Sequence, residues 1–337
     1  MLKEILVRLL EQGDMTRSES AAVLEMMIDG KVNDVQIAAI LTALSVKGPT
    51  VDELTGFAET MRRHAVKIQT KHKVFLDTAG TGGDGSKTFN ISTAASFVIA
   101  AAGVPVAKHG SKAATSISGA ADTLAALGMR IDAPPEVSAK ALDEIGICFL
   151  LAPFYHPAMS RVGGVRRQLG MQTVFNLLGP LTNPAGAPRQ LLGVFSDKYQ
   201  RHVAQALANL GSERAWVVRG YDGMDEISVC ARTRVAEVKN GEVRIFYIEP
   251  DQLGLKPVKP AELVGGDAAE NAKIVRDVLT GERRDGARDA VVANAAAGLI
   301  LGGITSDLEH AVAEAGATID SGAAYSKLQA LIEISNS

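Results

Sequence analysis

From residue 70 onward, short apolar runs alternate with helical patterns, and this alternation limits the possible folds more than any other feature. Five apolar runs have the length of buried strands, at 74–78, 104–107, 147–151, 191–195 and 215–219, and each precedes a helical pattern. Strands joined by helices pair in parallel, and the helices then cover the faces of the sheet. The sequence therefore predicts an α/β domain with a mostly parallel sheet.

The first 65 residues have a different pattern, which predicts four short helices. Three of the helix starts carry capping boxes, in which the N-cap side chain and one three residues later satisfy free backbone amides. These pairs are Thr16 with Glu19, Asn33 with Gln36, and Thr50 with Glu53. Gly13, Gly30 and Gly48 are expected just after helix ends. Four helices of this length cannot bury all their apolar faces alone, so we expect them to pack on the rest of the chain and on a second subunit.

Two segments interrupt the alternation of strands and helices. Residues 157–185 carry one helix and an irregular run, which we expect to rejoin the N-terminal helices. The polar stretch 231–268 predicts an antiparallel excursion with Asn240 and Gly241 as its hairpin turn, and helical patterns at 269–335 follow it. The expected domains are a helical one, formed by 1–68 with 157–190, and an α/β one, formed by 69–156 with 191–337.

Composition gives no sign of a general affinity for nucleic acid or membranes. The chain has 337 residues, of which 47% are hydrophobic, and a net charge of −3. This is enough apolar material for one or two large cores, and the charge provides no general attraction to nucleic acid or acidic lipid. The N-terminal residues begin an amphipathic helix rather than a signal peptide, and every long apolar stretch has polar interruptions. We therefore expect a cytoplasmic protein without a membrane partner.

A glycine-rich turn follows the first predicted strand and precedes a helix. Residues 80–85 read Gly-Thr-Gly-Gly-Asp-Gly, and residues 90–93, Asn-Ile-Ser-Thr, lead into an alanine-rich helical stretch. Small residues let backbone amides approach an anion, and a helix N-terminus favours negative charge. This combination predicts a phosphate-binding loop. Its acid, Asp84, suits a phosphate site when a divalent cation or a sugar hydroxyl lies between the two.

Two familiar phosphate motifs match this loop only in part. Gly80, Gly82 and Gly85 fit the dinucleotide fingerprint. The next apolar run, however, ends in Lys108 instead of the acid that would hold a ribose hydroxyl. A P-loop needs lysine directly after its last glycine, where this chain has Ser86. The loop thus departs from each motif at a specific residue.

A second group of candidate ligands follows the second predicted strand. Lys108, His109 and Gly110 begin a segment rich in donors, glycine and short hydroxyls that continues to Gly119. In an open α/β sheet, ligands bind at the carboxyl ends of the strands. The segment is therefore predicted to be a second anion-binding loop, although a solvated loop before the next helix has the same composition.

Charged side chains elsewhere complete the candidate site. Asp225 and Glu226 follow the fifth predicted strand and, with Asp84 and the Ser92 hydroxyl, offer the oxygen ligands that suit Mg²⁺. Arg166, in the helix of the 157–185 segment, is suited to clamp a carboxylate through its guanidinium. Read alone, the acidic pair and the arginine are also compatible with solvated surface.

In order and spacing, these motifs resemble those of the anthranilate phosphoribosyltransferases. The resemblance extends over nearly the whole chain and depends on residues 80–84, 90–93, 108–110, 175–184 and 225–226. It implies a helical domain joined to an α/β domain of the nucleoside phosphorylase and phosphoribosyltransferase type, and a homodimer formed through the helical part. It also implies a magnesium-dependent glycosyltransferase of tryptophan biosynthesis. This activity transfers phosphoribose from phosphoribosyl pyrophosphate (PRPP) to the amine of anthranilate, giving N-(5-phosphoribosyl)anthranilate and pyrophosphate.

The resemblance also implies roles for individual residues. The positions that match those holding PRPP are Gly80, Gly83, Asp84, Thr88, Asn90, Ile91, Ser92, Thr93, Lys108, His109, Gly110, Ser111, Lys112, Ala113, Ala114, Thr115, Ser116 and Ala120. One or two Mg²⁺ ions are expected at Ser92, Asp225 and Glu226, and anthranilate is expected at Gly80, Ser111 and Arg166. The residues expected to act in catalysis are Lys108, Asp225, Glu226 and Arg166.

Three positions depart from the pattern of this family. Ser111 and Lys112 replace a usual Asn-Arg pair, and Gln172 stands where arginine is frequent. Losing one neutral contact at Ser111 costs about 0.5–1.5 kcal/mol, or about tenfold in acceptor affinity. A phosphoribosyltransferase of the same fold with a different aromatic acceptor therefore stays an alternative. A relative that binds nucleic acid without transferase activity is another, against which the acidic pI of about 6.1 and the complete Asp225-Glu226 pair count. A pyrimidine nucleoside phosphorylase shares the architecture, but the chain is short for that class and lacks its loop signature.

Overall fold

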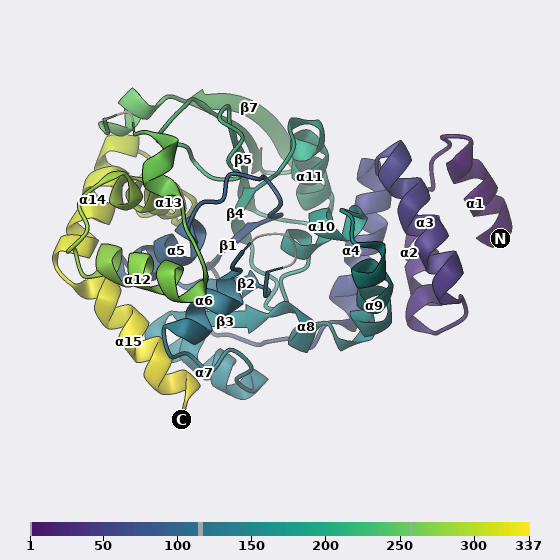
Figure 1. Cartoon of the computed structure of the whole chain (residues 1–337), viewed down its shortest axis with the longest axis horizontal. Helices are drawn as coiled ribbons and strands as arrows, with labels where there is room; N and C mark the ends of the chain where they lie inside the picture. The colour runs from purple at the N-terminus through teal and green to yellow at the C-terminus, as the bar shows by residue number, and fades with distance from the viewer. Residues whose placement is uncertain (1, 114–116, 257) are drawn as a thin grey trace.

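The computed structural model describes residues 2–113, 117–256 and 258–337, and a seven-stranded sheet forms the centre of this part of the chain (Figure 1). Its strands are β1 (Leu76–Gly80), β2 (Val106–Gly110), β3 (Ile147–Leu151), β4 (Arg189–Gly193), β5 (Arg214–Gly220), β6 (Thr233–Lys239) and β7 (Glu242–Ile248). The spatial order is β3-β2-β1-β4-β5-β6-β7, with the first five strands parallel and the last two antiparallel to their neighbours. The predicted α/β class with a mostly parallel sheet is confirmed.

The N-terminal bundle lies to one side of this sheet (Figure 1). Its helices are α1 (Leu2–Leu10), α2 (Arg17–Ile28), α3 (Asp34–Lys47) and α4 (Val51–His64). All three predicted capping boxes are confirmed. Gly30 and Gly48 have the positive φ expected after a helix end, at 69° and 85°. The expectation for Gly13 is wrong: Gln12 takes the left-handed conformation instead, with φ 64°, because α1 ends two residues earlier.

Four strands are displaced from their predicted bounds. The observed strands Leu76–Gly80, Val106–Gly110, Arg189–Gly193 and Arg214–Gly220 replace the predicted 74–78, 104–107, 191–195 and 215–219. Proline has no amide for a strand ladder, so β2 begins after Pro105. Pairing with β4 carries β1 onward to Gly80, opposite Gly193. As a result, Lys108 and His109 belong to a strand and are buried, whereas the sequence predicted them in the loop that follows.

The antiparallel excursion and the irregular segment both form recognisable structures. Asn240 and Gly241 join β6 to β7 with φ of 54° and 78°, and positive φ at both positions is typical of the predicted hairpin turn. The fifth strand is followed by this excursion and not by a helix. The irregular segment forms α8 (Ala152–Tyr155), η1 (Pro157–Met159), α9 (Ser160–Leu169), α10 (Val174–Leu178) and η2 (Gly179–Leu181). Within it, α9 packs on α2 and α3, and α10 packs on α3 and α4.

The remaining helices flank the sheet. They are α5 (Ile91–Ala101), α6 (Ala120–Ala126), α7 (Pro135–Ile145), α11 (Asp197–Asn209), α12 (Ala268–Leu279), α13 (Gly286–Gly302), α14 (Leu308–Asp320) and α15 (Ala323–Ser335), with η3 (Pro250–Leu253) and η4 (Pro260–Leu263). Among the described residues, none of the helices combines the length and the apolar character needed to span a bilayer.

Two apolar cores divide the molecule between the faces of the sheet. The larger one lies between one face and a layer that includes α5 and α13. In the other, the interior of the bundle, including Leu44 and Phe57, continues through α11 onto Leu192, Val217 and Val238 of the opposite sheet face. The bundle and the sheet therefore share one hydrophobic core.

Candidate active site

The carboxyl ends of β1 and β5 bring the glycine loop and the acidic pair together. Asp225 Oδ2 accepts a hydrogen bond from the Gly82 amide at 3.1 Å, and Glu226 Oε1 accepts one from the Ser92 amide at 3.2 Å. Gly82 lies in the loop after β1, and Ser92 is in the first turn of α5. Segments more than 130 residues apart in sequence thus form one cradle, at the edge where open α/β sheets bind ligands.

Glycines at two places make this approach possible. Gly82, Gly83 and Gly85 have φ of 61°, 79° and 77°, a conformation that side chains rarely adopt. At the end of β4, a Cβ on Gly193 would lie 1.5 Å from the carbonyl oxygen of Asp225. Only glycine therefore lets the acidic loop pass over β4 to reach the cradle.

The acidic pair is held in surroundings that disfavour its charge. Burial raises the pKa of the Asp225 carboxyl, and repulsion from Asp84 raises it further. Burial also raises the pKa of Glu226, and repulsion from Asp225 raises it further. The backbone amide of Asp225 donates to Asp84 Oδ2 at 3.3 Å, which keeps the third carboxylate close by. A bound cation would stabilise the ionised form of such a cluster.

Lys108 is the cation that β2 places beside this cluster. Its side chain is buried, and its ammonium donates to the Thr78 carbonyl and to Ser92 Oγ, the latter at 3.3 Å. Burial lowers its pKa, while Asp77 and Glu226 act in the opposite direction. Because the residue belongs to a strand, its charge is fixed between β1 and the start of α5.

The oxygen ligands fit a metal ion that is shared with a substrate. In the described part of the chain, no group of three or more His, Cys, Asp or Glu side chains is arranged to hold a metal. Asp225, Glu226 and the Ser92 hydroxyl supply a smaller set. Since Mg²⁺ usually leans on one or two carboxylates together with water and substrate phosphates, this set suits Mg²⁺ better than a metal held by protein alone.

Arg166 has no acidic partner among the described residues. It projects from α9, donates to Asn176 Oδ1 at 3.3 Å and lies 5.4 Å above the Phe175 ring. Its Nε is buried and has no partner in the described structure. Burial lowers its pKa. A guanidinium held in this way is suited to bind a carboxylate, whereas the adjacent Arg167 is exposed to solvent.

Gln172 connects the helical bundle to the glycine loop. Its Nε2 donates to the Gly83 carbonyl at 3.3 Å, and its backbone carbonyl accepts from Ser45 Oγ at 3.2 Å. The residue that departs from the family pattern therefore links α3 of the bundle to the glycine loop. Its side chain is one hydrogen bond away from the glycine loop.

The predicted second anion loop is anchored on α6. Ser111 and Lys112 are exposed, and Asp122 of α6 accepts hydrogen bonds from the amides of Ala113 and Gly119 at 2.8 and 3.0 Å. Ala120 begins that helix. The predicted ligands Ala114, Thr115 and Ser116 lie outside the described residues.

Several other predicted PRPP ligands lie close to the cradle in different environments. Ile91 is buried in the larger core, and Thr93 is buried with its hydroxyl unpaired among the described residues. Thr88 forms a β-bridge with Val264. At Gly80, a Cβ would approach Asp225 Oδ2 to 2.8 Å, so this position borders the acidic pair directly.

The His109 ring points away from the Lys108 side of β2, because side chains alternate along a strand. His109 Nδ1 is 3.2 Å from the Gly179 carbonyl, and the ring centroid is 5.3 Å from that of His156. His156 is in turn 3.0 Å from the Thr182 carbonyl through Nε2. Burial lowers the pKa of His109 to about 3, and repulsion from His156 contributes. A neutral imidazole therefore joins β2 to the η2 segment.

We expect the variant His109→Asn to lose less stability than the parent protein when the pH falls from 7.5 to 5. The pKa of His109 in the folded state, about 3, is below its unfolded value of about 6.5. The unfolded chain therefore takes up a proton first as the pH drops, and folding loses about 2 kcal/mol at pH 5. Urea unfolding of both proteins at the two pH values measures this difference. Buried Asp77, with a pKa raised to about 6, titrates in both proteins and cancels. Equal pH dependence in the two proteins would contradict a neutral His109.

Two buried polar residues beside the cradle were not predicted from the sequence. Asp77 on β1 accepts from the His109 amide at 3.0 Å, which ties β1 to β2. Asn271 on α12 is 2% exposed and hydrogen-bonds to Asn90 Oδ1. A carboxylate inside an apolar strand was a visible signal for Asp77. Asn271 had none, because its partners are far away in the sequence.

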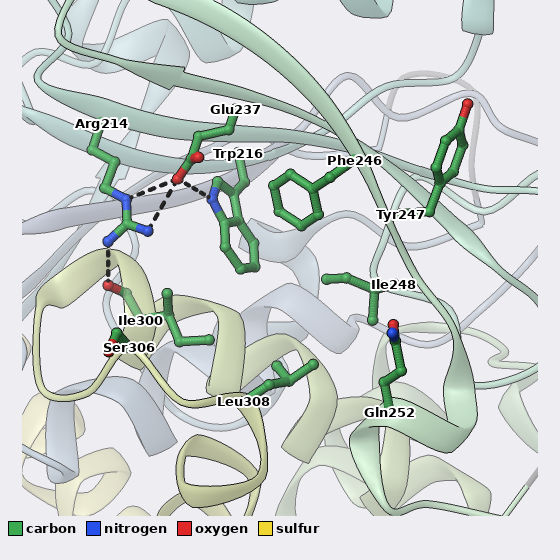
Figure 2. Close-up of a pocket in the computed structure, with 10 residues that line it drawn as sticks. All are labelled: Arg214, Trp216, Glu237, Phe246, Tyr247, Ile248, Gln252, Ile300, Ser306 and Leu308. Carbon is green, nitrogen blue, oxygen red and sulfur yellow. Dashed lines mark hydrogen bonds and ion pairs between the residues drawn. The ribbon is translucent and has the colours of Figure 1, made fainter.

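A cavity of about 370 Å³ lies at the beginning of β5, away from the carboxyl end that carries the acidic pair (Figure 2). Trp216 and Phe246 form part of its wall. Glu237 accepts from Arg214 and from Trp216 Nε1, and Arg214 also donates to the Ile300 carbonyl. These polar groups already pair with one another, and the cavity is not part of the candidate site.

Comparison with known proteins agrees with the architecture of a helical bundle joined to an α/β sheet. Residues 3–65 match the helical bundle domain of the glycosyl transferase family, and residues 72–325 match its a/b domain. The fold and the site thus define a glycosyl transferase of this two-domain class.

Individual relatives narrow this class to one family. The anthranilate phosphoribosyltransferase of Anaeromyxobacter sp. strain K is 51% identical over 98% of both chains. The crystal structure of the Thermus thermophilus enzyme matches with a TM-score of 0.92 at 41% identity, covering 98% of this chain and 99% of that one. The Saccharomyces cerevisiae enzyme in complex with PRPP and Mg matches with a TM-score of 0.90 at 29% identity, covering 99% and 98%. The chain belongs to the anthranilate phosphoribosyltransferase family.

Proposed function

We propose that this protein transfers phosphoribose from PRPP to the amine of anthranilate in a magnesium-dependent reaction. Besides family membership, one observation carries the proposal. The Asp225-Glu226 pair lies against the amides of Gly82 and Ser92, the donors that a phosphate would use. Carboxylates packed into an anion cradle are unfavourable unless a cation joins them to the anion.

The donor half of the reaction uses the carboxyl edge of the sheet. The amides of the glycine loop and of the start of α5 bind the phosphates of PRPP. Asp225, Glu226 and the Ser92 hydroxyl would hold one or two Mg²⁺ ions, which supply charge neutralisation as pyrophosphate departs from C1 of the ribose. Lys108, fixed beside Ser92, adds a positive charge on the same side. The yeast relative solved with PRPP and Mg supports PRPP and Mg²⁺ as the groups bound here.

The acceptor half needs positioning rather than acid–base chemistry. The aromatic amine is already neutral at pH 7, so its lone pair attacks C1 without a general base as the C1–O bond to pyrophosphate breaks, and the nitrogen then loses its extra proton to water. Arg166 binds the anthranilate carboxylate through its guanidinium. Alignment of two bound substrates then supplies a large part of the rate. We assign 1–68 with 157–190 to the acceptor side, and 69–156 with 191–337 to PRPP.

Anthranilate fluorescence tests this activity directly. We expect the signal to fall when PRPP and MgCl₂ are added to the protein, and to stay constant when EDTA is also present. A constant signal in both mixtures would overturn anthranilate as acceptor. If calorimetry then still detects PRPP binding, the donor site is retained and a different acceptor is required.

Ser111 favours a second candidate, a substituted aromatic acceptor. The residue is exposed, and its side chain is shorter than the asparagine usual in the family. A ring-substituted anthranilate would be accommodated there with less crowding. Comparison of kcat/KM for anthranilate and its methyl-substituted forms decides between them, since preference for a substituted ring by more than about tenfold would favour this candidate.

We also propose that two copies associate through the outer face of the bundle. Leu10 of α1 and Val35 and Val46 of α3 are 67%, 78% and 72% exposed. Exposed apolar residues grouped on adjoining helices are typical of an interface, and α1 packs on α3. A homodimer formed there would leave both carboxyl edges of the sheets open to substrate.

Val35→Asp is expected to convert this dimer into a monomer, because a charge would be buried at the interface. Light scattering during size exclusion should give about twice the chain mass of 35.3 kDa for the parent protein and a single chain mass for the variant. Ile304→Asp, at an apolar site that is 47% exposed on the turn after α13, is the control and should stay dimeric. A parent protein that elutes as a monomer would contradict the interface.

A further inference from the structure

Asn90, the residue that precedes α5, is held by partners from three other segments. Its Oδ1 accepts from Asn271 Nδ2 at 3.1 Å and from the Thr123 hydroxyl. Its Nδ2 donates to the Ser118 carbonyl at 3.4 Å. The carboxamide is therefore fixed at both of its ends, between α12 and α6 on one side and the 111–119 loop on the other.

The orientation of this carboxamide is set by backbone groups that cannot change role. Asn271 Oδ1 accepts from the Gly266 amide at 2.8 Å, and an amide can only donate. Asn271 must then turn its NH₂ group toward Asn90, which must present its oxygen in return. At the opposite end, the Ser118 carbonyl can only accept, which requires the same orientation of Asn90. The Gly266 amide and the Ser118 carbonyl therefore require the same orientation of Asn90. One Nδ2 hydrogen of Asn90 remains to donate to a ligand anion.

Gly266 belongs to a short strap, residues 263–266, which lies against residues 87–89 at the end of the glycine loop. The Phe89 amide donates to the Leu263 carbonyl at 3.0 Å, and the Gly265 amide donates to the Lys87 carbonyl at 2.9 Å. A Cβ on Gly265 would lie 2.4 Å from Asn271 Oδ1, so the strap and Asn271 are packed without free space. Asn271 thus connects the strap, the glycine loop and Asn90.

We propose that Asn271 is a positioning residue for PRPP binding, which acts by holding the Asn90 carboxamide with its remaining N–H toward the phosphate. This role rests on the proposed function, in which Asn90 is a PRPP ligand. Asn271 itself is buried on α12 and contacts PRPP only through Asn90. An aspartate at position 271 would still accept from Gly266, but as a carboxylate it would no longer donate to Asn90. The Asn90 carboxamide would then be unable to satisfy both the new carboxylate and the Ser118 carbonyl, so its orientation toward a phosphate oxygen would no longer be fixed.

Calorimetric titration with PRPP and MgCl₂, without anthranilate, tests this role. We expect Asn271→Asp to raise the Kd for PRPP by about tenfold or more, which corresponds to about 1.4 kcal/mol. The KM for anthranilate at saturating PRPP should stay within about twofold. Asn271→Ser, which is uncharged and too short to reach both partners, should weaken PRPP binding in the same way and covers the case in which the aspartate variant fails to fold.

A matched control separates positioning from a general loss of stability. Gln200 is likewise a fully buried amide, donating to the Val217 and Arg234 carbonyls at 2.8 Å on the far side of β5. Gln200→Glu should lower the unfolding temperature at least as much as Asn271→Asp, while the Kd for PRPP stays within about twofold of the parent value. An equal loss of PRPP affinity in this control would overturn the positioning role.

A double-mutant cycle identifies the path of the effect. If Asn271 acts through Asn90, then Asn271→Asp in an Asn90→Ala background weakens PRPP binding no further. Multiplicative effects of the two changes would overturn this path, as would an unchanged Kd in Asn271→Asp. Failure of the parent protein to bind PRPP, or an unchanged Kd in Asn90→Ala, would instead overturn the proposed donor site, and the role of Asn271 with it.

Discussion

Replacing Asp225 with Asn and Glu226 with Gln together is expected to lower turnover by about a thousandfold or more, while the unliganded protein becomes more stable. The loss of turnover follows from the missing metal ligands, since a Lewis acid supplies several kcal/mol to the departure of an anionic group. The gain in stability follows from the buried acids. Their folded pKa values are raised above those of the unfolded chain, so their ionisation destabilises the fold as the pH rises above about 4.

Two measurements made on the same double variant check this prediction. Steady-state kinetics at saturating PRPP and anthranilate give the turnover over a range of MgCl₂ concentrations. Thermal unfolding at pH 8 without ligand should give a higher midpoint for the variant than for the parent protein. Asp222→Asn serves as the control for damage to the loop. Asp222 belongs to the same loop, but its carboxylate accepts a hydrogen bond from the Ser228 hydroxyl. Turnover close to the parent value at low MgCl₂ would contradict the metal assignment.

Arg166→Ala is expected to raise the KM for anthranilate by about 10- to 100-fold and to leave the KM for PRPP nearly unchanged. Removing a hydrogen-bonded ion pair with a carboxylate costs about 1.5–3 kcal/mol. The effect is confined to the acceptor because, in the described structure, the guanidinium bonds to Asn176 and to no residue of the glycine loop.

Two neighbouring substitutions sharpen the test of Arg166. Arg166→Lys keeps the charge but loses the planar fork, so its KM for anthranilate should lie between those of the parent and the alanine variant. Arg167→Ala removes an exposed arginine one position along the helix and should behave as the parent protein. Equal increases in both KM values for Arg166→Ala would contradict the carboxylate clamp.

Features that depend on residues close in sequence were the ones predicted well. The capping boxes at Thr16, Asn33 and Thr50 each involve residues three positions apart, so the sequence contains the whole interaction. The turn at Asn240 and Gly241 is equally local. The alternation of strands with helices predicted the sheet because it reflects the burial of whole segments.

Features decided by distant partners were predicted less well. The pairing of β1 with β4, and not local propensity, carries β1 to Gly80. His109 was identified as part of a motif, but only the strand register shows that its ring faces Gly179. Asn271 was missed altogether, since an asparagine in an amphipathic helix has no signature until its partner 181 residues away is known.

The shared core of the bundle and the sheet also determines whether the chain can be cut into two stable fragments. The family descriptions separate the chain between residues 65 and 72, which is a boundary in sequence. The apolar packing ignores that boundary, because Phe57 of the bundle and Val217 of the sheet belong to the same interior. Cutting there would expose both of these surfaces to water and divide the core that the bundle shares with the sheet. We therefore expect a chimera of two relatives to keep its stability best when the bundle and this face of the sheet come from the same parent.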